Sequence, residues 1–522
     1  MPGRVCASIL QRVLTAPVSS QGPQLSLFNY PTQHGQHCHL LSSRINGTAQ
    51  TWTTSRTSHL SFVGKRSFST RQDLDFQLSQ VQINSILRSN EQSVSVPEFD
   101  GRGLCSVRKF ESNQLAANSP NEDRRSAVTC LQSKGMLFGV FDGHGGWTCA
   151  QAICERLLYY IAVAMMPKHS LEEMDRCVAQ GRAVPPILQW YKHHSDYNYR
   201  DSAALYIEHL RVFWQELLEN EEYSKGMSPP DALDLAFRRL DADISLEAQL
   251  PLTNSLLKST AIQVAFAGST ACVAHVGPDV IHVANAGDCR AVLGVQEEDG
   301  SWSALPLSSD HNSQNPSEVQ RIRAQHPSSE RDTVLADDRL LGMLMPLRAF
   351  GDVRFKWSVE LQQSVMSSLD SSVDVASLNL YNYVPPSYKS PPYLDVTPEI
   401  TGHKLRPQDR FLILGSDGLW DELSNHEAVQ LVGEHLSGIH LQAPVSQTER
   451  KLKLGKLFEV LQKRRARASP ALDTNAAPTS SATLWAGTTT ASCVRRGWPP
   501  CSRSQRTLHV CTGTISLLLS ST

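Results

Sequence analysis

Two aspartates in the chain occur in the same local setting. Asp142 follows the apolar run Leu137–Phe141. Asp417 comes shortly after the apolar run Phe411–Leu414, and a glycine directly follows each aspartate. We interpret each run as a buried strand that carries a carboxylate to its end, where the glycine allows the backbone to turn tightly. Oxygen ligands held at a sheet edge in this way suit Mg²⁺ or Mn²⁺ and not zinc.

Either motif alone is more often a glycine-capped turn whose aspartate is solvated, so neither identifies a metal site by itself. Further acidic residues occur at Glu122, Asp123, Asp288 and Asp352. Together these carboxylates favour a site for divalent cations. The alternative, a set of unrelated turns, stays open on these residues alone.

Seven short motifs extend this pattern along the chain. In their order they resemble the motifs of the metal-dependent, 2C-class Ser/Thr protein phosphatases, from about Phe110 to about Leu436. The motifs are Asn121–Arg124, Phe141–Gly146, Gly268–Ala271, Asn285–Arg290, Ser309–His311, Arg348–Asp352 and Ser416–Asp421. The resemblance implies an enzyme that hydrolyses phosphoserine or phosphothreonine in proteins.

Finer features resemble one branch of that family, the mitochondrial pyruvate dehydrogenase phosphatase catalytic subunits. These features are Arg108–Ala116, Pro186–Trp190, Gly294–Gly300, Arg339–Gly342 and Leu405–Asp409. Residues 114–125 and 282–294 look most similar to the second isoform of the branch. The resemblance implies the phosphorylated pyruvate dehydrogenase α subunit as substrate. It also implies the lipoyl domains of the acetyltransferase core as partners, with a regulatory subunit as a further candidate.

The resemblance assigns metal-binding roles to three residues. It implies that Asp142 bridges two Mg²⁺ or Mn²⁺ ions in one active site. It implies that the carbonyl of Gly143 points to the first ion and that Asp417 ligates the second. The two strand-end aspartates would thus belong to a single binuclear site.

Four more residues receive roles from the resemblance. Glu122 and Asp123 would hold metal-bound waters, and Asp288 resembles the ligand of a third, weaker metal. His144 resembles the general acid that protonates the leaving serine oxygen. Two cations about 3.5–4 Å apart neutralise the phosphate charge and lower the pKa of a shared water, so that hydroxide attacks in line. A protonated His144 suits the basic alkoxide that departs, while the alternative is a turn histidine without a catalytic role.

The chain departs from the family pattern at two places. The family usually has a phosphate-binding arginine four residues before the Glu-Asp pair, where this chain has Asn118, and the mitochondrial branch also lacks that arginine. The family ends in a strand preceded by a carboxylate that completes the second metal site, whereas no Asp or Glu follows Asp473 here. We hypothesise that the reading frame shifts just after Ala477. We therefore expect the protein as written to be poorly active or unstable.

The carboxylates need strands and helices that hold them in place. Apolar periodicity predicts helices over 149–165, 205–218, 231–250, 318–325 and 426–436. Short β-prone runs predict strands over 261–266, 269–275, 280–284 and 289–295. This pattern favours an α+β fold of antiparallel sheets covered by helices. With the resemblance, it implies a four-layer α-β-β-α sandwich that lacks its last strand.

The N-terminus differs in composition from the rest of the chain. Residues 1–72 contain no Asp or Glu but several Arg and many Ser and Thr, which is typical of a mitochondrial transit peptide. An ordinary disordered tail is the alternative. We expect a transit peptide over 1–68, an incomplete phosphatase domain over 73–477 and an aberrant, disordered tail over 478–522. The enzyme would then lie in the mitochondrial matrix.

The composition of all 522 residues argues against other classes of protein. A formal net charge of −2 gives no basic field for nucleic acid. No apolar run reaches the ~18 residues that span a bilayer, and the twelve cysteines show no zinc spacing. Two functions remain: a metal-dependent protein phosphatase, or a catalytically impaired phosphatase-like protein that docks on the pyruvate dehydrogenase complex. The missing terminal carboxylate favours the second for this particular chain.

Overall fold

The computed structural model describes residues 80–96, 105–116, 120–193, 196, 203–251, 254–369, 384–437 and 513–520. The chain divides into two units, Met1–Ile83 and Asn84–Thr522, and the fold below is that of the second. The transit peptide expected over 1–68 lies outside the described residues, as does most of the tail expected over 478–522. Among the described helices, none combines the length and the apolar character that a membrane crossing requires.

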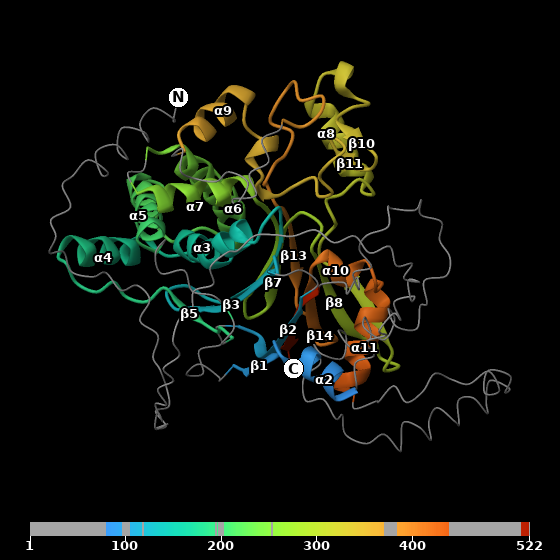
Figure 1. The fold of residues 1–522 in the computed structure, drawn as a ribbon. Helices are drawn as coiled ribbons and strands as arrows, with labels where there is room; N and C mark the ends of the chain where they lie inside the picture. The colour runs from blue at the N-terminus through green and yellow to red at the C-terminus, as the bar shows by residue number, and fades with distance from the viewer. Residues whose placement is uncertain are drawn as a thin grey trace, which may run out of the picture. The chain divides into compact units, whose positions relative to one another are not determined.

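Two antiparallel sheets form the centre of the second unit (Figure 1). The six-stranded sheet has the order β1 (Gln92–Ser95), β2 (Val107–Leu115), β15 (Gly513–Ser520), β14 (Asp409–Gly415), β8 (Arg290–Gln296) and β9 (Trp302–Pro306). The seven-stranded sheet has the order β13 (Glu399–Lys404), β7 (Val280–Ala286), β6 (Gly268–Val276), β4 (Met136–His144), β3 (Arg124–Cys130) and β5 (Leu188–Trp190), with β12 (Phe350–Gly351) paired to β6.

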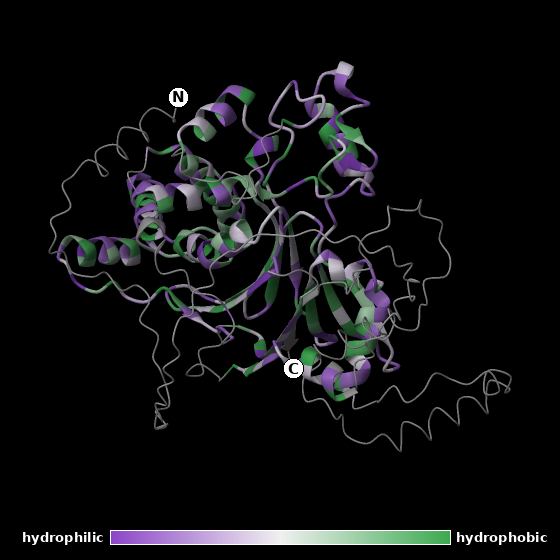
Figure 2. Cartoon of the chain, in the orientation of Figure 1, coloured by the Kyte–Doolittle hydropathy of each residue, from purple (hydrophilic) through white to green (hydrophobic). Residues whose placement is uncertain are grey.

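The core between the two sheets is apolar on both facing sides. Phe138 and Cys272 from the seven-stranded sheet belong to one buried cluster with Ala291 and Leu412 from the six-stranded sheet. Strands buried on one or both faces read as apolar runs in the sequence, which is why these segments could be predicted. Figure 2 shows hydrophobic residues along the sheets and more hydrophilic ones on the outer helices and loops.

Helices cover the outer face of each sheet. Helices that share a buried cluster with the seven-stranded sheet include α3 (Thr148–Ala164), α4 (Lys168–Ala179), α5 (Ala203–Glu219), α6 (Pro229–Gln249) and α7 (Ser255–Phe266). The helices α10 (Asp417–Trp420) and α11 (Asn425–Leu436) pack on the six-stranded sheet. A further described helix is α2 (Gln80–Arg88). The predicted α+β fold of antiparallel sheets and helices is therefore confirmed.

Local sequence explains where several helices begin. Ser228 caps α6 by accepting a hydrogen bond from the backbone of Asp231, and prolines occupy the first turn. Ser424 and Glu427 form a capping box at the start of α11. Both starts lie close to the predicted positions.

One predicted strand is wrong. Residues 261–266 form the C-terminal half of α7, not a strand. The side chain of Asn254 accepts hydrogen bonds from the backbone of Leu256 and Leu257 and starts the helix upstream of the apolar run. Ile262 and Phe266 then pack into the helical layer. A short apolar run does not distinguish a strand from a buried helix by periodicity alone.

The expectation that the last strand is missing is also corrected. Strand β15 pairs with β14 on one side and with β2 on the other, so it lies inside the six-stranded sheet. Its sequence contains the apolar run Ile515–Leu519. The backbone of this strand pairs with the N–H and C=O groups that β2 and β14 would otherwise leave unpaired at their edges. Within the tail 478–522, residues 513–520 are thus part of the sheet.

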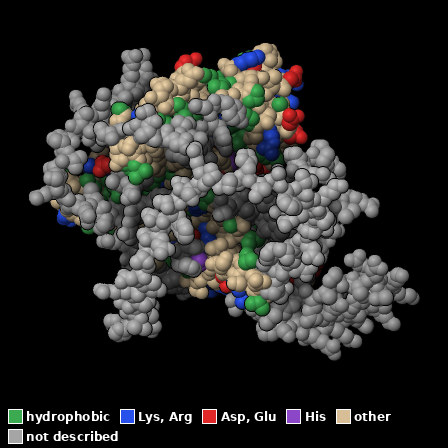
Figure 3. All heavy atoms as spheres, viewed as in Figure 1, with side chains coloured by type: hydrophobic (Ala, Val, Ile, Leu, Met, Phe, Trp, Pro, Cys, Tyr) green, Lys and Arg blue, Asp and Glu red, His purple; other side chains and the backbone are tan. Residues whose placement is uncertain are grey.

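A smaller substructure follows β9 in the chain and has a core of its own. It contains α8 (Pro316–Gln325), the hairpin of β10 (Leu335–Ala336) and β11 (Arg339–Leu340) and two 3₁₀ turns, and α9 (Val359–Ser367) follows it and packs through Val365 into the cluster of the seven-stranded sheet. Ile322, Leu341 and Tyr393 belong to its buried cluster. Exposed residues of both charge signs, such as Arg331 and Asp332, cover it, and Figure 3 shows both signs at the upper right of the visible face.

Candidate metal centre and active site

Strand pairing brings the predicted carboxylates to one end of the two sheets. Arg124 of β3 is paired with Phe141 of β4, so the preceding Asp123 lies beside Asp142. In the other sheet Gly415 of β14 is paired with Arg290 of β8. The residues just beyond that pair are Asp417 on one chain segment and Asp288 on the other. The register of two sheets therefore gathers residues that are far apart in the sequence.

Asp142 and Asp417 are close enough for a hydrogen bond between their carboxyl groups. Burial, and then the negative charges of Asp123, Asp417 and Asp288, raise the pKa of Asp142 well above its usual range. None of the ion pairs among the described residues includes Asp142, Asp288 or Asp417. The cluster thus concentrates negative charge that no arginine or lysine in the described part of the chain neutralises by direct contact.

Asp288 lies in the tight connection between β7 and β8. Gly287 has a φ of +119°, and its amide donates to Nδ1 of His311 at 3.1 Å, while the amide of His311 donates back to the carbonyl of Gly287 at 2.9 Å. Burial, and then the charge of Asp417, raise the pKa of Asp288 to about 7. The turn therefore holds a buried carboxyl near the other two.

The Glu122–Asp123 pair supports the site from the adjoining strand. The hydroxyl of Ser416 donates to Oδ2 of Asp123 at 2.9 Å, which ties Asp123 to the residue before Asp417. Oε1 of Glu122 accepts a hydrogen bond from the amide of Gly146 at 2.9 Å. Burial raises the pKa of Glu122, although that amide opposes the shift. Both carboxylates thus have fixed positions beside the cluster.

Gly143 is needed because the backbone of Glu122 passes very close to it. A Cβ atom on residue 143 would lie 2.5 Å from the carbonyl oxygen of Glu122, a contact that real side chains do not make. The absence of a side chain lets the strand end with Asp142 while the Glu122 segment packs against it. The glycine that the sequence singled out therefore has a steric reason in the structure.

His144 forms an ion pair with Asp352. Its Nε2 lies 2.5 Å from Oδ2 of Asp352, and the side chains are 26% and 5% exposed. Although burial opposes the charged imidazole, the charge and the hydrogen bond of Asp352 raise the pKa of His144. Gly268 lies opposite His144 in β6, and a Cβ there would overlap both His144 and Asp352. An imidazole that a carboxylate orients, and whose charged form that carboxylate favours, therefore lies at this end of the sheet.

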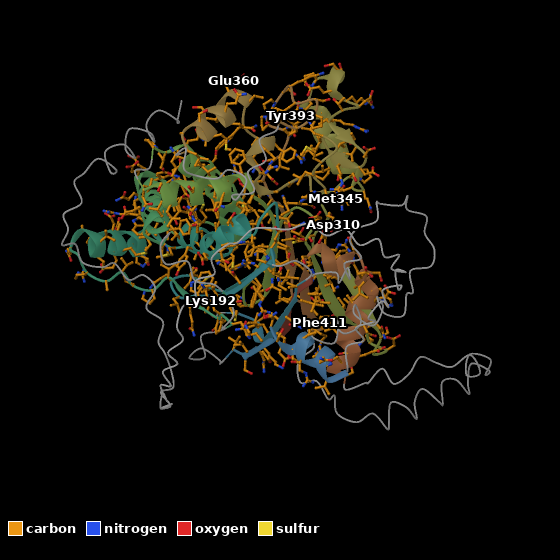
Figure 4. The ribbon with its side chains drawn as sticks, in the orientation of Figure 1. Lys192, Asp310, Met345, Glu360, Tyr393 and Phe411 are labelled. Carbon is orange, nitrogen blue, oxygen red and sulfur yellow. The ribbon has the colours of Figure 1, made fainter. Side chains whose placement is uncertain are left out.

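A cavity of ≈ 330 Å³ opens over these groups. Asp142, Asp288, Asp417, His144 and Asp352 line it, whereas Glu122, Asp123 and Gly143 are not among the described lining residues. The rest of the described lining is formed mainly by Met343–Pro346, Phe355, Arg339 and Arg354. These residues belong to the small substructure, and Figure 4 labels Met345 there near Asp310. The amide of Leu347 donates to the carbonyl of His311 at 2.7 Å and joins the two segments.

The donor set can be tested against a divalent metal. No group of three or more His, Cys, Asp or Glu among the described residues is arranged so that it could hold a metal ion by itself. Mg²⁺, however, is commonly held by one or two carboxylates and several waters. The carboxyl groups of Asp142 and Asp417 are in contact, and both residues line the cavity. Hard oxygen donors with uncompensated charge fit Mg²⁺ or Mn²⁺.

Several residues of the site were missed or left without a role by the sequence. Asp352 was only one of several acids, because nothing in the sequence shows that it contacts His144. Arg339, Arg354 and the apolar wall received no site role. Arg339 lies in the motif 339–342, and Asp352 ends the motif 348–352. Their membership of these motifs was the one sign in the sequence that they could belong to the site. Asn118, where an arginine was expected, lies outside the described residues.

Comparison with known proteins agrees with this geometry. The family model for protein phosphatase 2C matches residues 187–452. Pyruvate dehydrogenase (acetyl-transferring) phosphatase 1, mitochondrial, of Bos taurus is 52% identical over 417 residues, which are 79% of this chain and 77% of that protein. The corresponding phosphatase 2 of Homo sapiens is 49% identical over 405 residues, 78% of this chain and 76% of that protein.

Among solved structures, serine-threonine phosphatase 2C from Toxoplasma gondii aligns with 82% of this chain and 99% of its own, at 16% identity and a TM-score of 0.39. The assignment rests on the family model, which covers about half of the chain, and on the relatives at about half identity. With the strand-end carboxylates and the His144–Asp352 pair in place, the chain belongs to the protein phosphatase 2C family.

Proposed function

We propose that this chain removes phosphate from phosphoserine of the pyruvate dehydrogenase α subunit in the mitochondrial matrix. The observation that carries the proposal is the 52% identity to a mitochondrial pyruvate dehydrogenase phosphatase over 79% of the chain. The cavity lined by Asp142, Asp417 and His144 supports hydrolysis of a phosphate ester at the same place. As partners we propose the lipoyl domains of the acetyltransferase core, with a regulatory subunit as a further candidate.

We assign the metal-holding role to the carboxylates at the sheet ends. Asp142, with the carbonyl of Gly143, and Asp417 would hold two Mg²⁺ or Mn²⁺ ions. Glu122 and Asp123 would orient water around them, and Asp288 would serve a third, weaker ion. When bound, two such ions neutralise the phosphate charge and lower the pKa of a water towards neutrality.

The protein side chains supply the remaining chemistry. His144, held by Asp352, donates its proton to the serine oxygen as the P–O bond breaks. Its Nε2 is the atom that contacts Asp352 in the structure, so a ring movement or the second nitrogen presents the proton to the substrate. The apolar wall at Met343–Pro346 borders the cavity and limits the access of water on that side.

A second function is favoured by one specific observation. No Asp or Glu follows Asp473, so β15 brings no carboxylate to the end of the sheet where Asp417 lies. A site with one ligand fewer binds metal more weakly, which would leave a phosphatase-like protein that docks on the dehydrogenase complex with little turnover. This alternative shares the fold and the partners with the first proposal but not the activity.

The isoform assignment is a finer part of the proposal. Residues 114–125 and 282–294 support a likeness to the second isoform, while identity across the chain is 52% to phosphatase 1 and 49% to phosphatase 2. The isoforms are therefore close to equidistant over the matched region. We keep the pyruvate dehydrogenase phosphatase type as the conclusion.

Release of phosphate from phosphorylated α subunit tests the two functions against each other. The full chain is incubated with the phosphorylated subunit in Mg²⁺ or Mn²⁺, with a His144→Gln variant as control. Metal-dependent release that the variant loses supports the enzyme. Binding to the complex without release supports the docking protein, and neither release nor binding contradicts both.

A further inference from the structure

Two arginines line the cavity, and neither has a carboxylate partner in the part of the chain that the structure describes. Other cations near the site are already engaged: Arg290 pairs with Asp310 at 2.5 Å and Lys356 pairs with Asp241 at 2.8 Å. Arg348 likewise pairs with Glu318. No ion pair among the described residues includes Arg339 or Arg354, although both border the cavity. Arg339 and Arg354 are therefore positively charged lining residues whose charge is available to an anion that enters the cavity.

The backbone at Arg354 is held firmly. Residues Val353–Phe355 form a 3₁₀ turn directly after Asp352, and the neighbours on both sides, Val353 and Phe355, are buried. The amide of Phe355 donates to the carbonyl of Asp352 at 2.9 Å. Nε2 of Gln362 donates to the carbonyl of Arg354 at 3.1 Å. A single residue, Val353, lies between Arg354 and Asp352, the partner of His144, so the backbone position of Arg354 relative to the His144–Asp352 pair is fixed.

The guanidinium of Arg354 has unused donors. One nitrogen, Nη2, donates to the carbonyl of Phe266 at 3.3 Å. Nε is buried and has no hydrogen-bond partner among the described residues. An arginine offers five N–H groups in a planar fork, and buried donors are nearly always satisfied in a working protein. Nε is enclosed, so the part of the guanidinium that an anion in the cavity would meet is Nη1, which makes no hydrogen bond among the described residues and is not among the buried unsatisfied atoms.

Arg339 differs from Arg354 in exposure and engagement. It is exposed at the end of the β10–β11 hairpin, and its Nη1 donates to the carbonyl of Met343 at 3.1 Å. Arg354 is partly buried and follows the Asp352 that contacts His144. Arg354 is thus better placed to contact the phosphate group of a substrate. Arg339 is better placed to contact the rest of the substrate.

We propose that Arg354 binds the non-bridging oxygens of the substrate phosphate. This inference rests on the proposed function, because it concerns the phosphomonoester dianion that the same cavity would hydrolyse. The planar guanidinium matches two phosphate oxygens at once and carries a charge that does not titrate. It provides positive charge in the lining of the same cavity that the carboxylates line. Position 118 is asparagine in this chain and supplies no guanidinium.

Binding of orthophosphate to the full chain tests Arg354 without requiring turnover. The dissociation constant is measured by ³¹P nuclear magnetic resonance at saturating Mg²⁺ for the wild type, Arg354→Gln and Arg354→Lys. Arg323→Gln is the matched control, since Arg323 is an exposed arginine of α8 that does not line the cavity. Melting temperature and Mn²⁺ affinity report whether each variant keeps its fold and metal site.

We expect Arg354→Gln to weaken orthophosphate binding by about tenfold or more, since hydrogen bonds to charged groups are among the strong ones. Arg354→Lys keeps a charge but not the fork, so its affinity should lie between the two. Arg323→Gln should match the wild type. In steady-state kinetics on a phosphoserine peptide, Arg354→Gln should raise KM while Mn²⁺ affinity stays unchanged.

The outcomes separate this inference from the proposed function. If Arg354→Gln and Arg354→Lys bind orthophosphate as the wild type does, the inference is overturned even when the chain hydrolyses the peptide. If binding falls as expected but the wild type hydrolyses nothing, the role of Arg354 stands and the enzymatic function fails. A wild type that binds no orthophosphate, or a control that loses binding equally, also overturns the inference.

Discussion

His144 and Asp352 are 208 residues apart in the sequence but form one ion pair at the cavity. Three strands make this contact. His144 ends β4, Gly268 lies opposite it in β6, and Gly351 pairs with Gly268 from β12. Because Gly268 has no side chain, the imidazole and the carboxylate meet across it. The pair thus places a proton donor, oriented by the sheet, beside the carboxylates of Asp142 and Asp417.

Replacing Asp352 by asparagine tests that pair. Asparagine keeps the size but removes the charge that raises the pKa of His144, so proton donation should weaken. We expect kcat for a phosphoserine peptide to fall about 100-fold, because general acid catalysis contributes ~10²–10⁴-fold. For p-nitrophenyl phosphate, whose leaving group needs little protonation, the loss should stay below about tenfold. Steady-state kinetics on both substrates provide the comparison.

Gly268→Ala should reproduce the same dependence on the leaving group. The added Cβ overlaps both members of the pair, so it should separate them without changing a charge. Circular dichroism shows whether the variant keeps its fold. Equal losses on the two substrates in both variants would contradict a proton-donating role for His144.

At the scale of elements, a buried ionic network ties the helical layer together. Arg156 of α3 makes a two-pronged contact with Glu247 of α6, at 2.6 and 3.0 Å, and both are almost fully buried. Nδ1 of His209 in α5 lies 2.6 Å from Oε1 of Glu247. Although burial opposes ionisation, the charge of Arg156 and the hydrogen bond of His209 lower the pKa of Glu247 to about 2. Three helices therefore depend on one carboxylate.

Glu247→Gln should lower the free energy of unfolding at neutral pH by about 3–5 kcal/mol, since it leaves a buried arginine without its partner. The folded pKa lies below the ordinary value of 4.5, so the stabilisation is complete above about pH 4.5 and is lost as pH falls towards 2. Over that window the wild type should lose roughly 3 kcal/mol that the variant lacks. Urea titration at several pH values measures both.

Glu173→Gln is the matched control for this prediction. Glu173 pairs with Arg176 on the surface of α4, where both side chains are largely exposed. An exposed pair contributes less than ~1 kcal/mol, so this variant should keep the stability and the acid response of the wild type. A similar loss in both variants would contradict the structural role of the buried network.

The last strand brings a second element-scale prediction. Ile515 of β15 is paired with Gly415, the last residue of β14, so Gly513 lies at the end of β15 towards the start of α10, where Asp417 is the first residue. Gly513→Asp would therefore return a carboxylate to the end of the sheet where the chain has none. We expect the Mn²⁺ concentration for half-maximal activity to fall on the order of tenfold, the range that ligand-shell changes produce.

Ser520→Asp offers the same charge at the opposite end of β15. It should leave the Mn²⁺ requirement unchanged. A metal titration of peptide hydrolysis compares the two variants with the wild type. If Gly513→Asp has no effect, or if Ser520→Asp has the same effect, the carboxylate missing from the tail does not limit metal binding.

Over the whole molecule, the sequence predicted most of the elements that hold the site. The strand ends at Asp142 and Asp417 were recognisable because each buried strand is a continuous apolar run followed by a polar turn. The starts of α6 and α11 were recognisable from capping and proline signals. The gathering of Asp123, Asp142 and Asp288 was expected only from the family resemblance.

The rest depends on contacts that no local pattern encodes. The contact between His144 and Asp352 requires three strands in register and the missing Cβ of Gly268. Residues 261–266 are equally apolar as helix or strand, and the cap at Asn254 decides between them. The place of β15 follows from the open edges of β2 and β14, which only the assembled sheet presents.

The central claim is that Asp142 and Asp417 together hold the divalent cations for phosphoserine hydrolysis. Hydrolysis of a phosphoserine peptide by the full chain, titrated with Mn²⁺ in the wild type, Asp142→Asn and Asp417→Asn, tests it most directly. We predict turnover that vanishes with chelator, a loss of at least about 100-fold in Asp142→Asn, and a raised Mn²⁺ requirement in Asp417→Asn. Turnover that persists without metal, or that Asp142→Asn retains, would contradict the claim.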